Sequence, residues 1–354
     1  MEAILQAYHE LKNSNHPLPF GEGHINDTYL VDTPSGKYIL QKVNPKVFDT
    51  EVLVQNLSRF FDALASYEKE TGQKLTPAVI KNKNGDFHTL DHDGAAWRLV
   101  EFFPGCNSYP LSPNENITFH AAEAMGKFQR FLNRFSMQDF GETIPNFHNP
   151  HRRLQVFLST LQESPASLQK QAAPEIEFVL SHQNIAVEIK KLLDSNAIPR
   201  RITHNDTKLD NLLFLPGGRV LVIDLDTVMP GHVIFDYGDM VRTYTSPVKE
   251  DEKDIAKVQL RIPHFRALTQ GYLQALKDVL TEPEKQNLLL GAKAILYEQT
   301  LRFLTDFLMG NIYYKTDYPE HNLVRTRTQI KLLSDILQQE NELLEIIRKI
   351  LRMQ

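Results

Sequence analysis

The segment ITHNDTKLDNLLF, residues 202–214, places four side chains that could do chemistry between two apolar runs. His204, Asp206 and Lys208 occupy every second position, and Asn211 follows three residues later. A carboxylate next to apolar segments costs free energy unless a cation or hydrogen-bond donors compensate it. The segment is therefore either a solvated loop without a role or a place where a reacting group and a cation are held.

A second carboxylate follows the next two predicted strands. The run NLLFLPGGRVLVIDLDT predicts a hairpin that turns at residues 216–218. Asn211 starts one arm and Asp224 ends the other, so antiparallel pairing predicts that Asp224 returns close to Asn211 and Asp206. Mg²⁺ takes such oxygen ligands and keeps positions open for phosphate. Asp226 is a further carboxylate beside this position, with either a metal-related or a structural role.

The composition is that of an ordinary globular protein. The chain has 354 residues, of which 42% are hydrophobic and 23% charged, so it is long enough for two lobes with separate cores. A formal net charge of −5 argues against nucleic acid as the main partner. The single cysteine, Cys106, excludes an internal disulfide. No apolar run has transmembrane length and the first residues do not resemble a signal peptide, so we expect a cytoplasmic protein without a membrane partner.

Residues 20–103 predict a small, mainly antiparallel sheet with one long helix. A short helix opens the chain at ILQAYHELK, and two β-rich runs around PSG predict a hairpin. The segment from residue 50 to 70 has a period of 3.6 residues, with Asp49 or Thr50 as its cap and Gly72 just beyond its end. Further strands follow, with tight turns at NKNGD and DHDG.

After FFPG the chain changes to mainly helical patterns. Helices are predicted from about residue 114, from Thr281 with Glu284 as a capping box, and over the closing run TQIKLLSDILQQENELLEIIRKILRMQ. One β-rich island lies within this half, from Arg201 to about Asp226. The predicted fold is α+β and two-lobed, with an N-lobe at residues 1–103 and a helical C-lobe at residues 104–354. We expect the apolar stripe of the closing helix to pack on the body of the protein, in a monomer or a weak homodimer.

HNDTKLDN resembles the catalytic loop of the protein-kinase-like superfamily, and VIDLD resembles the strand that ends in its metal-binding aspartate. The resemblance implies that Asp206 is the catalytic base and that Lys208 contacts the transferred phosphoryl group. It also implies that Asn211 and Asp224 hold Mg²⁺. His204 is expected to support the loop rather than to react.

The N-terminal half carries a weaker resemblance to the nucleotide-binding lobe of the same superfamily. FGEGHINDTYLV lies where a phosphate-covering loop belongs, which implies that Gly21 and Gly23 approach ATP. The following strand offers Gln41 where the superfamily has a lysine, and Lys42 is next. Side chains alternate along a strand, so these two point to opposite faces and the phosphate contact stays open between them. Backbone groups of WRLVEFF, between Glu101 and Phe103, are expected to contact adenine.

FDYGDMVR resembles the small-molecule kinases of the aminoglycoside phosphotransferase and choline kinase-like group. Within that group, GHINDTYLV, THNDTKLDN, IDLDTVMPG and YPEHNLVRTRTQIKL resemble the N-acetylhexosamine 1-kinases. This resemblance implies that His24, Asn26, Arg302 and Tyr313 contact a sugar. Arg302 lies one helical turn after Glu298, and such a pair is either a salt bridge or a device for binding hydroxyl groups.

The function implied by the resemblance is ATP-dependent phosphorylation of the anomeric hydroxyl of N-acetylglucosamine or N-acetylgalactosamine. One alternative is a kinase of another small alcohol, such as choline, homoserine or an aminoglycoside. A second is a non-catalytic nucleotide-binding scaffold, although Asp206 and Asp224 are both present. The expected partners are the small substrate and ATP.

Overall fold

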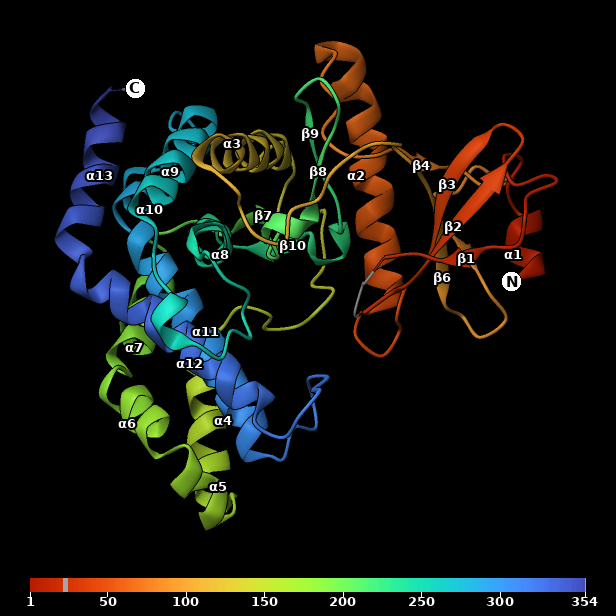
Figure 1. The fold of residues 1–354 in the computed structure, drawn as a ribbon. Helices are drawn as coiled ribbons and strands as arrows, with labels where there is room; N and C mark the ends of the chain where they lie inside the picture. Colours follow the sequence, from red (N-terminus) through yellow and green to blue (C-terminus); the bar gives the residue numbers. More distant parts are fainter. Residues whose placement is uncertain (22–24, 354) are drawn as a thin grey trace. The chain divides into compact units, whose positions relative to one another are not determined.

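The computed structural model describes residues 1–21 and 25–353 (Figure 1). The chain forms two compact units, and neither is continuous in sequence. Unit 1 consists of Met1–Asn107, Phe135–Pro145 and Leu213–Pro230, and unit 2 consists of Ser108–Arg134, Asn146–Leu212 and Gly231–Gln354. The lobe boundary after residue 103 stays a prediction, and the structure adds that two later segments belong with the first hundred residues.

A six-stranded antiparallel sheet forms the body of the N-terminal part of unit 1 in the described residues. Its strands are β1 (Leu18–Pro19), β2 (Asp27–Thr33), β3 (Gly36–Lys42), β4 (Val79–Ile80), β5 (Thr89–Leu90) and β6 (Ala96–Glu101). The order is β1-β2-β3-β6-β4, and β5 also pairs with β6. The predicted hairpin is confirmed, because Thr33 pairs with Gly36 across a two-residue turn.

The long helix of unit 1 is α2 (Thr50–Thr71), and its ends confirm the predicted caps. The side chain of Asp49 accepts a hydrogen bond from the Val52 N–H at 3.1 Å, and Gly72 ends the helix in a left-handed conformation with φ 68°. Leu53 and Phe61 of α2 are buried in unit 1. Helix α1 (Glu2–Gln6) is shorter than the sequence pattern predicted.

The predicted hairpin of residues 212–222 is also confirmed. β8 (Leu212–Phe214) pairs with β9 (Val220–Val222), and Gly217 and Gly218 turn the chain with φ of 88° and 87°. The 3-10 helix η2 (Leu225–Thr227) and β10 (Met229–Gly231) follow. Hydrogen bonds join these segments to unit 1: the Val222 N–H donates to the Leu75 carbonyl at 2.9 Å, and Asn56 donates to the Gly141 and Val228 carbonyls.

Unit 2 is mainly helical. Its elements are α3 (Glu115–Leu132), α4 (Pro150–Glu163), α5 (Ala166–Gln171), α6 (Ala173–Ser181), α7 (Asn184–Asp194), β7 (Arg201–Thr203), η1 (Leu209–Asn211), α8 (Val233–Thr245), η3 (Ile255–Lys257), α9 (Ile262–Leu276), α10 (Glu282–Gln286), α11 (Leu288–Leu308), α12 (His321–Gln338) and α13 (Glu340–Met353). α3 lies along α9, and the deeply buried α11 packs against α4, α7, α8 and α12 (Figure 1).

Two predicted long helices are each broken into two. The helix expected from Thr281 keeps its capping box, but it ends at Asn287, whose side chain donates to the Pro283 carbonyl at 2.8 Å. The closing helix is interrupted at Gln339, and this break lets α13 pack its apolar residues, such as Leu343 and Ile347, toward α9. Among the helices of the described residues, none is long and apolar enough to cross a membrane.

Candidate active site

The predicted catalytic loop lies in unit 2, between β7 and β8, and includes η1. Asn211 donates from Nδ2 to the Asp206 Oδ2 at 2.9 Å and to the Asp206 carbonyl oxygen at 2.8 Å. The Lys208 Nζ lies 3.3 Å from the same Oδ2. The structure therefore brings together three of the four loop side chains that the sequence singled out.

The charge state of Asp206 follows from these neighbours. Burial on its own raises the pKa of Asp206, but Lys208, His204 and the hydrogen bond from Asn211 outweigh burial and hold this pKa below its usual value. Asp206 is therefore a carboxylate at neutral pH. A carboxylate in this position can accept a hydrogen bond from a substrate hydroxyl and then take its proton.

Asp236 of α8 holds the backbone of the loop. Its carboxylate accepts hydrogen bonds from the His204 N–H at 3.0 Å and the Asn205 N–H at 2.9 Å, and its carbonyl accepts one from the Thr207 hydroxyl at 2.7 Å. Burial raises the pKa of Asp236 to about 7, although the two backbone N–H groups and His148 oppose this rise. The sequence marked FDYGD only as a resemblance, and the structure gives its first aspartate this supporting contact.

His148 is a second support that the sequence did not reveal. Its Nε2 donates to the Asn205 carbonyl at 2.8 Å, and its Nδ1 lies 3.3 Å from Oε1 of Glu298. The Asn205 carbonyl and the Glu298 carboxylate both favour the protonated ring, which has a donor on each nitrogen. Burial lowers the pKa of His148, but Glu298 outweighs it and the net pKa is raised. No sequence pattern around FHNPH indicated this role.

His204 has the supporting role that the sequence predicted. Its side chain is buried, its Nδ1 accepts the Asp206 N–H at 3.3 Å, and its ring packs on Phe128 with centroids 5.7 Å apart. The ring therefore shapes the backbone next to Asp206.

The donor set fits a divalent cation. Asn211 donates through Nδ2, and no described residue donates a hydrogen bond to its amide oxygen, which is the atom suited to a hard cation. Asp224 has a left-handed backbone with φ 60° and ψ 62°, a conformation that aspartate and asparagine adopt more readily than other non-glycine residues. Asp224 belongs to unit 1 and Asn211 to unit 2, so their convergence on one cation stays a prediction.

The residues predicted to bind the nucleotide belong to unit 1. Gly21 has φ 80°, while Gly23 and His24 lie outside the described residues. The Glu101 N–H donates to the Ala78 carbonyl at 2.9 Å, so this group is already used within the sheet. Lys74 pairs with the Glu101 carboxylate and lies 5.2 Å from the centroid of the Phe103 ring. The adenine contact predicted for this segment stays a prediction.

Asp226 belongs to a buried polar network in unit 1. Its Oδ2 accepts a hydrogen bond from Asn26 Nδ2 at 2.5 Å, and its Oδ1 pairs with Arg98 of β6. The Asn26 Oδ1 accepts from the Asn44 N–H at 3.1 Å, so Asn26 is engaged within the protein. Both carboxylate oxygens of Asp226 therefore have partners, which supports its structural interpretation. No sequence motif distinguishes Arg98 from other arginines in strands, so the sequence did not indicate its role.

Arg302 of α11 lies between two aromatic rings instead of pairing with Glu298. Its guanidinium carbon lies 5.7 Å from the centroid of Phe147 and 5.6 Å from that of Tyr314. Glu298 pairs with His148, so the salt bridge between Glu298 and Arg302 is not formed. In the described part of the chain, no side chain or carbonyl accepts a hydrogen bond from Arg302.

The buried carboxylate of Asp306 shapes the loop that carries Tyr313. It accepts hydrogen bonds from the Tyr313 N–H at 2.8 Å, the Tyr314 N–H at 2.9 Å and the Asn322 side chain at 2.8 Å. The Tyr313 ring is 72% exposed and packs edge-on against Tyr314, with centroids 4.8 Å apart. An exposed aromatic ring is thus held next to the Arg302 stack.

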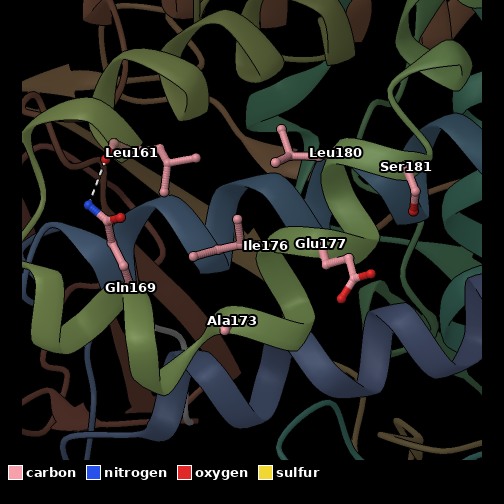
Figure 2. Close-up of a pocket in the computed structure, with 7 residues that line it drawn as sticks. All are labelled: Leu161, Gln169, Ala173, Ile176, Glu177, Leu180 and Ser181. Carbon is pink, nitrogen blue, oxygen red and sulfur yellow. Dashed lines mark hydrogen bonds between the residues drawn. The ribbon is translucent and has the colours of Figure 1, made fainter.

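A shallow depression on α4, α5 and α6 has a volume of about 620 Å³ (Figure 2). Leu161, Ile176 and Leu180 contribute large apolar side chains to its lining, and Gln169 donates to the Leu161 carbonyl at 2.9 Å. None of its lining residues is basic or belongs to the predicted site. This depression therefore does not provide the phosphate chemistry that the loop implies.

The antiparallel sheet of unit 1, the helical unit 2 and the Asp-Lys-Asn loop define a kinase-like phosphotransferase, and the predicted α+β fold is confirmed. The model of the phosphotransferase enzyme family, APH, matches residues 17–269. The chain belongs to this family. Membership implies that the protein phosphorylates a small-molecule alcohol with ATP and a divalent metal.

Solved structures share the fold at low sequence identity. A microcompartment-associated aminopropanol kinase is 16% identical with a TM-score of 0.63, covering 96% of this chain and 97% of its own. An aminoglycoside phosphotransferase from Alicyclobacillus acidocaldarius is 13% identical with a TM-score of 0.60, covering 100% and 97%. Amicoumacin kinase, solved with AMP-PNP, Ca²⁺ and Ami, is 13% identical with a TM-score of 0.59, covering 93% and 91%. These likenesses concern the fold and leave the substrate of this chain to be argued from its own residues.

Proposed function

We propose that the protein transfers the γ-phosphoryl group of ATP to the anomeric hydroxyl of N-acetylglucosamine or N-acetylgalactosamine, giving the sugar 1-phosphate. The general activity follows from the family, and the sugar is our assignment. The observation that carries it is the Arg302 stack: a guanidinium between Phe147 and Tyr314, next to the exposed ring of Tyr313. Hydrogen-bond donors beside an aromatic ring suit a neutral polyol, whose hydroxyl and acetamido oxygens accept hydrogen bonds.

The same stack argues against a cationic substrate. A choline or aminoglycoside site needs acidic groups or open aromatic faces for the substrate ammonium. Here Arg302 already lies over one face each of Phe147 and Tyr314, and its positive charge repels a second cation. This arrangement supports our assignment of a neutral sugar over an amino alcohol.

In the proposed reaction, Asp206 accepts a hydrogen bond from the anomeric hydroxyl and takes its proton. The sugar oxygen forms a bond to the γ-phosphorus, the bond from that phosphorus to the bridging oxygen breaks, and ADP leaves. Mg²⁺, bound through Asn211 and Asp224, would offset negative charge on the phosphate oxygens. Lys208, 3.3 Å from Asp206, adds a cationic contact to the transferred group. His148 and Asp236 keep the loop in place during the transfer.

The test is coupled ADP release from ATP and Mg²⁺ with a panel of acceptors. The panel contains both N-acetylhexosamines, glucose, glucosamine, choline, homoserine and kanamycin. We expect turnover with the N-acetylhexosamines and a sugar 1-phosphate product in the ³¹P spectrum. The 1-O-methyl glycoside of N-acetylglucosamine is the matched control, because its anomeric oxygen is blocked. Turnover of choline but not of the sugars rules out our substrate, and ATP binding without any turnover supports a scaffold.

A further inference from the structure

The phosphates of ATP need a cation in the nucleotide-binding part of a kinase. On the face of β3 that carries Gln41, the strand itself does not supply one. Gln41 shares a face with Thr28, to which its Nε2 donates at 3.3 Å, and with Arg98. Lys42 points to the other face, where its Nζ lies 3.3 Å from the Asp91 carboxylate and 5.6 Å from the centroid of the Trp97 ring. The lysine next to Gln41 is therefore engaged elsewhere.

Arg98 places a buried cation on the Gln41 face. It lies in β6 directly opposite Gln41 in the antiparallel register, and its Nε donates to Gln41 Oε1 at 2.9 Å. Its Nη1 pairs with Asp226, whose backbone carbonyl accepts the Thr143 hydroxyl at 2.8 Å. Arg98 is 7% exposed. Its guanidinium is therefore fixed from two sides before any ligand arrives.

Asp226 contacts both Arg98 and Asn26, and these two partners connect Arg98 to segments that carry predicted site residues. Asp226 follows the predicted metal ligand Asp224 by two residues, and its second oxygen accepts a hydrogen bond from Asn26, which lies five residues after Gly21 in the sequence. A guanidinium has five N–H donors, and the two contacts described use only Nε and Nη1. In the described residues, no acceptor is bonded to Nη2. A fixed guanidinium with donors to spare suits two neighbouring phosphate groups.

A structural role alone explains this arrangement less well. Burying an ion pair costs desolvation free energy, and apolar side chains of similar size usually stabilise a fold at least as much. We propose that Arg98 binds the α- and β-phosphates of ATP, with Gln41 and Asp226 holding it in position. Arg98 thus takes the place that a β3 lysine has in other kinases. The proposal depends on ATP as the phosphoryl donor and not on the identity of the acceptor.

The experiment measures the affinity of the full chain for ATP, ADP and adenosine by calorimetry with Mg²⁺ and without any acceptor. We expect Arg98→Gln to weaken ADP and ATP binding about 10- to 100-fold, because a hydrogen bond between charged groups is lost. Adenosine affinity stays the same, since adenosine has no phosphate. Lys81→Gln is the matched control, because it removes a surface cation of unit 1 that pairs with Asp62.

A second variant separates phosphate binding from a purely structural role. Arg98→Gln leaves the buried Asp226 without its cation, so Arg98→Gln/Asp226→Asn removes both charges together. We expect the double variant to fold, as checked by thermal unfolding, and still to bind ADP weakly. Recovery of normal ADP affinity in the double variant overturns the proposal, because Arg98 then serves only to neutralise Asp226. A Lys42→Gln variant with the same loss of ADP but not adenosine binding also overturns it. Because no acceptor is present, these results are independent of the sugar assignment.

Discussion

A methyl group on Gly291 of α11 would lie 2.1 Å from the carbonyl oxygen of Ile234 in α8. Gly238 of α8 meets α11 in the same way, since a methyl group there would lie 2.6 Å from the Gly291 carbonyl oxygen. The two helices therefore touch through their backbones. α8 carries Asp236, which holds the catalytic loop, and α11 carries Arg302, which lies over the rings of Phe147 and Tyr314. The close packing of the two helices therefore holds these two parts of unit 2 in place relative to each other.

We expect Gly291→Ala to lower the free energy of unfolding by about 2 to 4 kcal/mol, because the helices must separate. Urea unfolding followed by circular dichroism measures the change. Alanine is favoured over glycine inside a helix by about 1 kcal/mol, so an open site would give the opposite sign. Unchanged or increased stability would show that the two backbones are not in close contact.

Asp206→Asn should separate chemistry from nucleotide binding. The amide cannot take a proton from the acceptor hydroxyl, so we expect kcat to fall about 10²- to 10⁴-fold. ADP affinity should change little, because the adenine and phosphate contacts proposed here lie in unit 1. Steady-state kinetics and calorimetry measure the two quantities. The control is Asp210→Asn, which changes the next carboxylate of the loop, an exposed one. Wild-type turnover in the Asp206 variant would remove this residue from its assigned role.

Arg302→Met should raise KM for the sugar about 10- to 100-fold and leave KM for ATP unchanged, because it removes charged donors from the proposed sugar site. Methionine keeps a flexible apolar chain between Phe147 and Tyr314, so the stack loses its charge and keeps its volume. Steady-state kinetics with each substrate varied in turn measures both constants. Equal changes in both KM values, or a loss of thermal stability alone, would indicate that Arg302 supports the fold and does not contact the sugar.

His232 should make folding stability depend on pH. Its Nδ1 donates to the Pro199 carbonyl at 3.2 Å, and burial lowers the pKa of His232 to about 4 despite this contact. An unfolded histidine titrates near pH 6.5, so the unfolded chain binds more protons between about pH 4 and 6.5. The stabilisation is complete above this window and is lost as the pH falls through it.

The free energy of unfolding of the wild type should therefore fall by more than that of His232→Gln when the pH is lowered from 7.5 to 4.5. We expect the difference between the two falls to be about 2 kcal/mol. Glutamine keeps a donor for the Pro199 carbonyl and does not titrate. Urea unfolding at several pH values measures the difference, and the exposed His92 provides the control substitution His92→Gln. Identical pH profiles for His232→Gln and the wild type would contradict the assignment.

Local patterns predicted the elements of this protein better than its long-range contacts. The sequence predicted three local features, because each depends on a few neighbouring residues: the Asp49 cap, the Thr281 capping box and the hairpin turn at Gly217. The breaks at Asn287 and Gln339 were not, because the apolar pattern continues through both positions.

The same limit applies to the site. Asp206, Lys208 and Asn211 lie within six residues of one another, so the sequence grouped them correctly. His148 reaches Glu298 across 150 positions, and Arg98 reaches Asp226 across 128. Such contacts depend on tertiary packing, and no local spacing encodes them. Of the two roles that the sequence left open for Glu298 and Arg302, the salt bridge is not formed, and Glu298 pairs with the distant His148.

The three-part construction of unit 1 has a consequence for its synthesis. The Leu75 carbonyl receives its partner from Val222, and the Asn56 side chain receives partners from Gly141 and Val228. A ribosome that has released only the first 107 residues has therefore not yet supplied these partners. The Leu75 carbonyl and the Asn56 side chain of α2 therefore stay without these partners until Val228 has been synthesised.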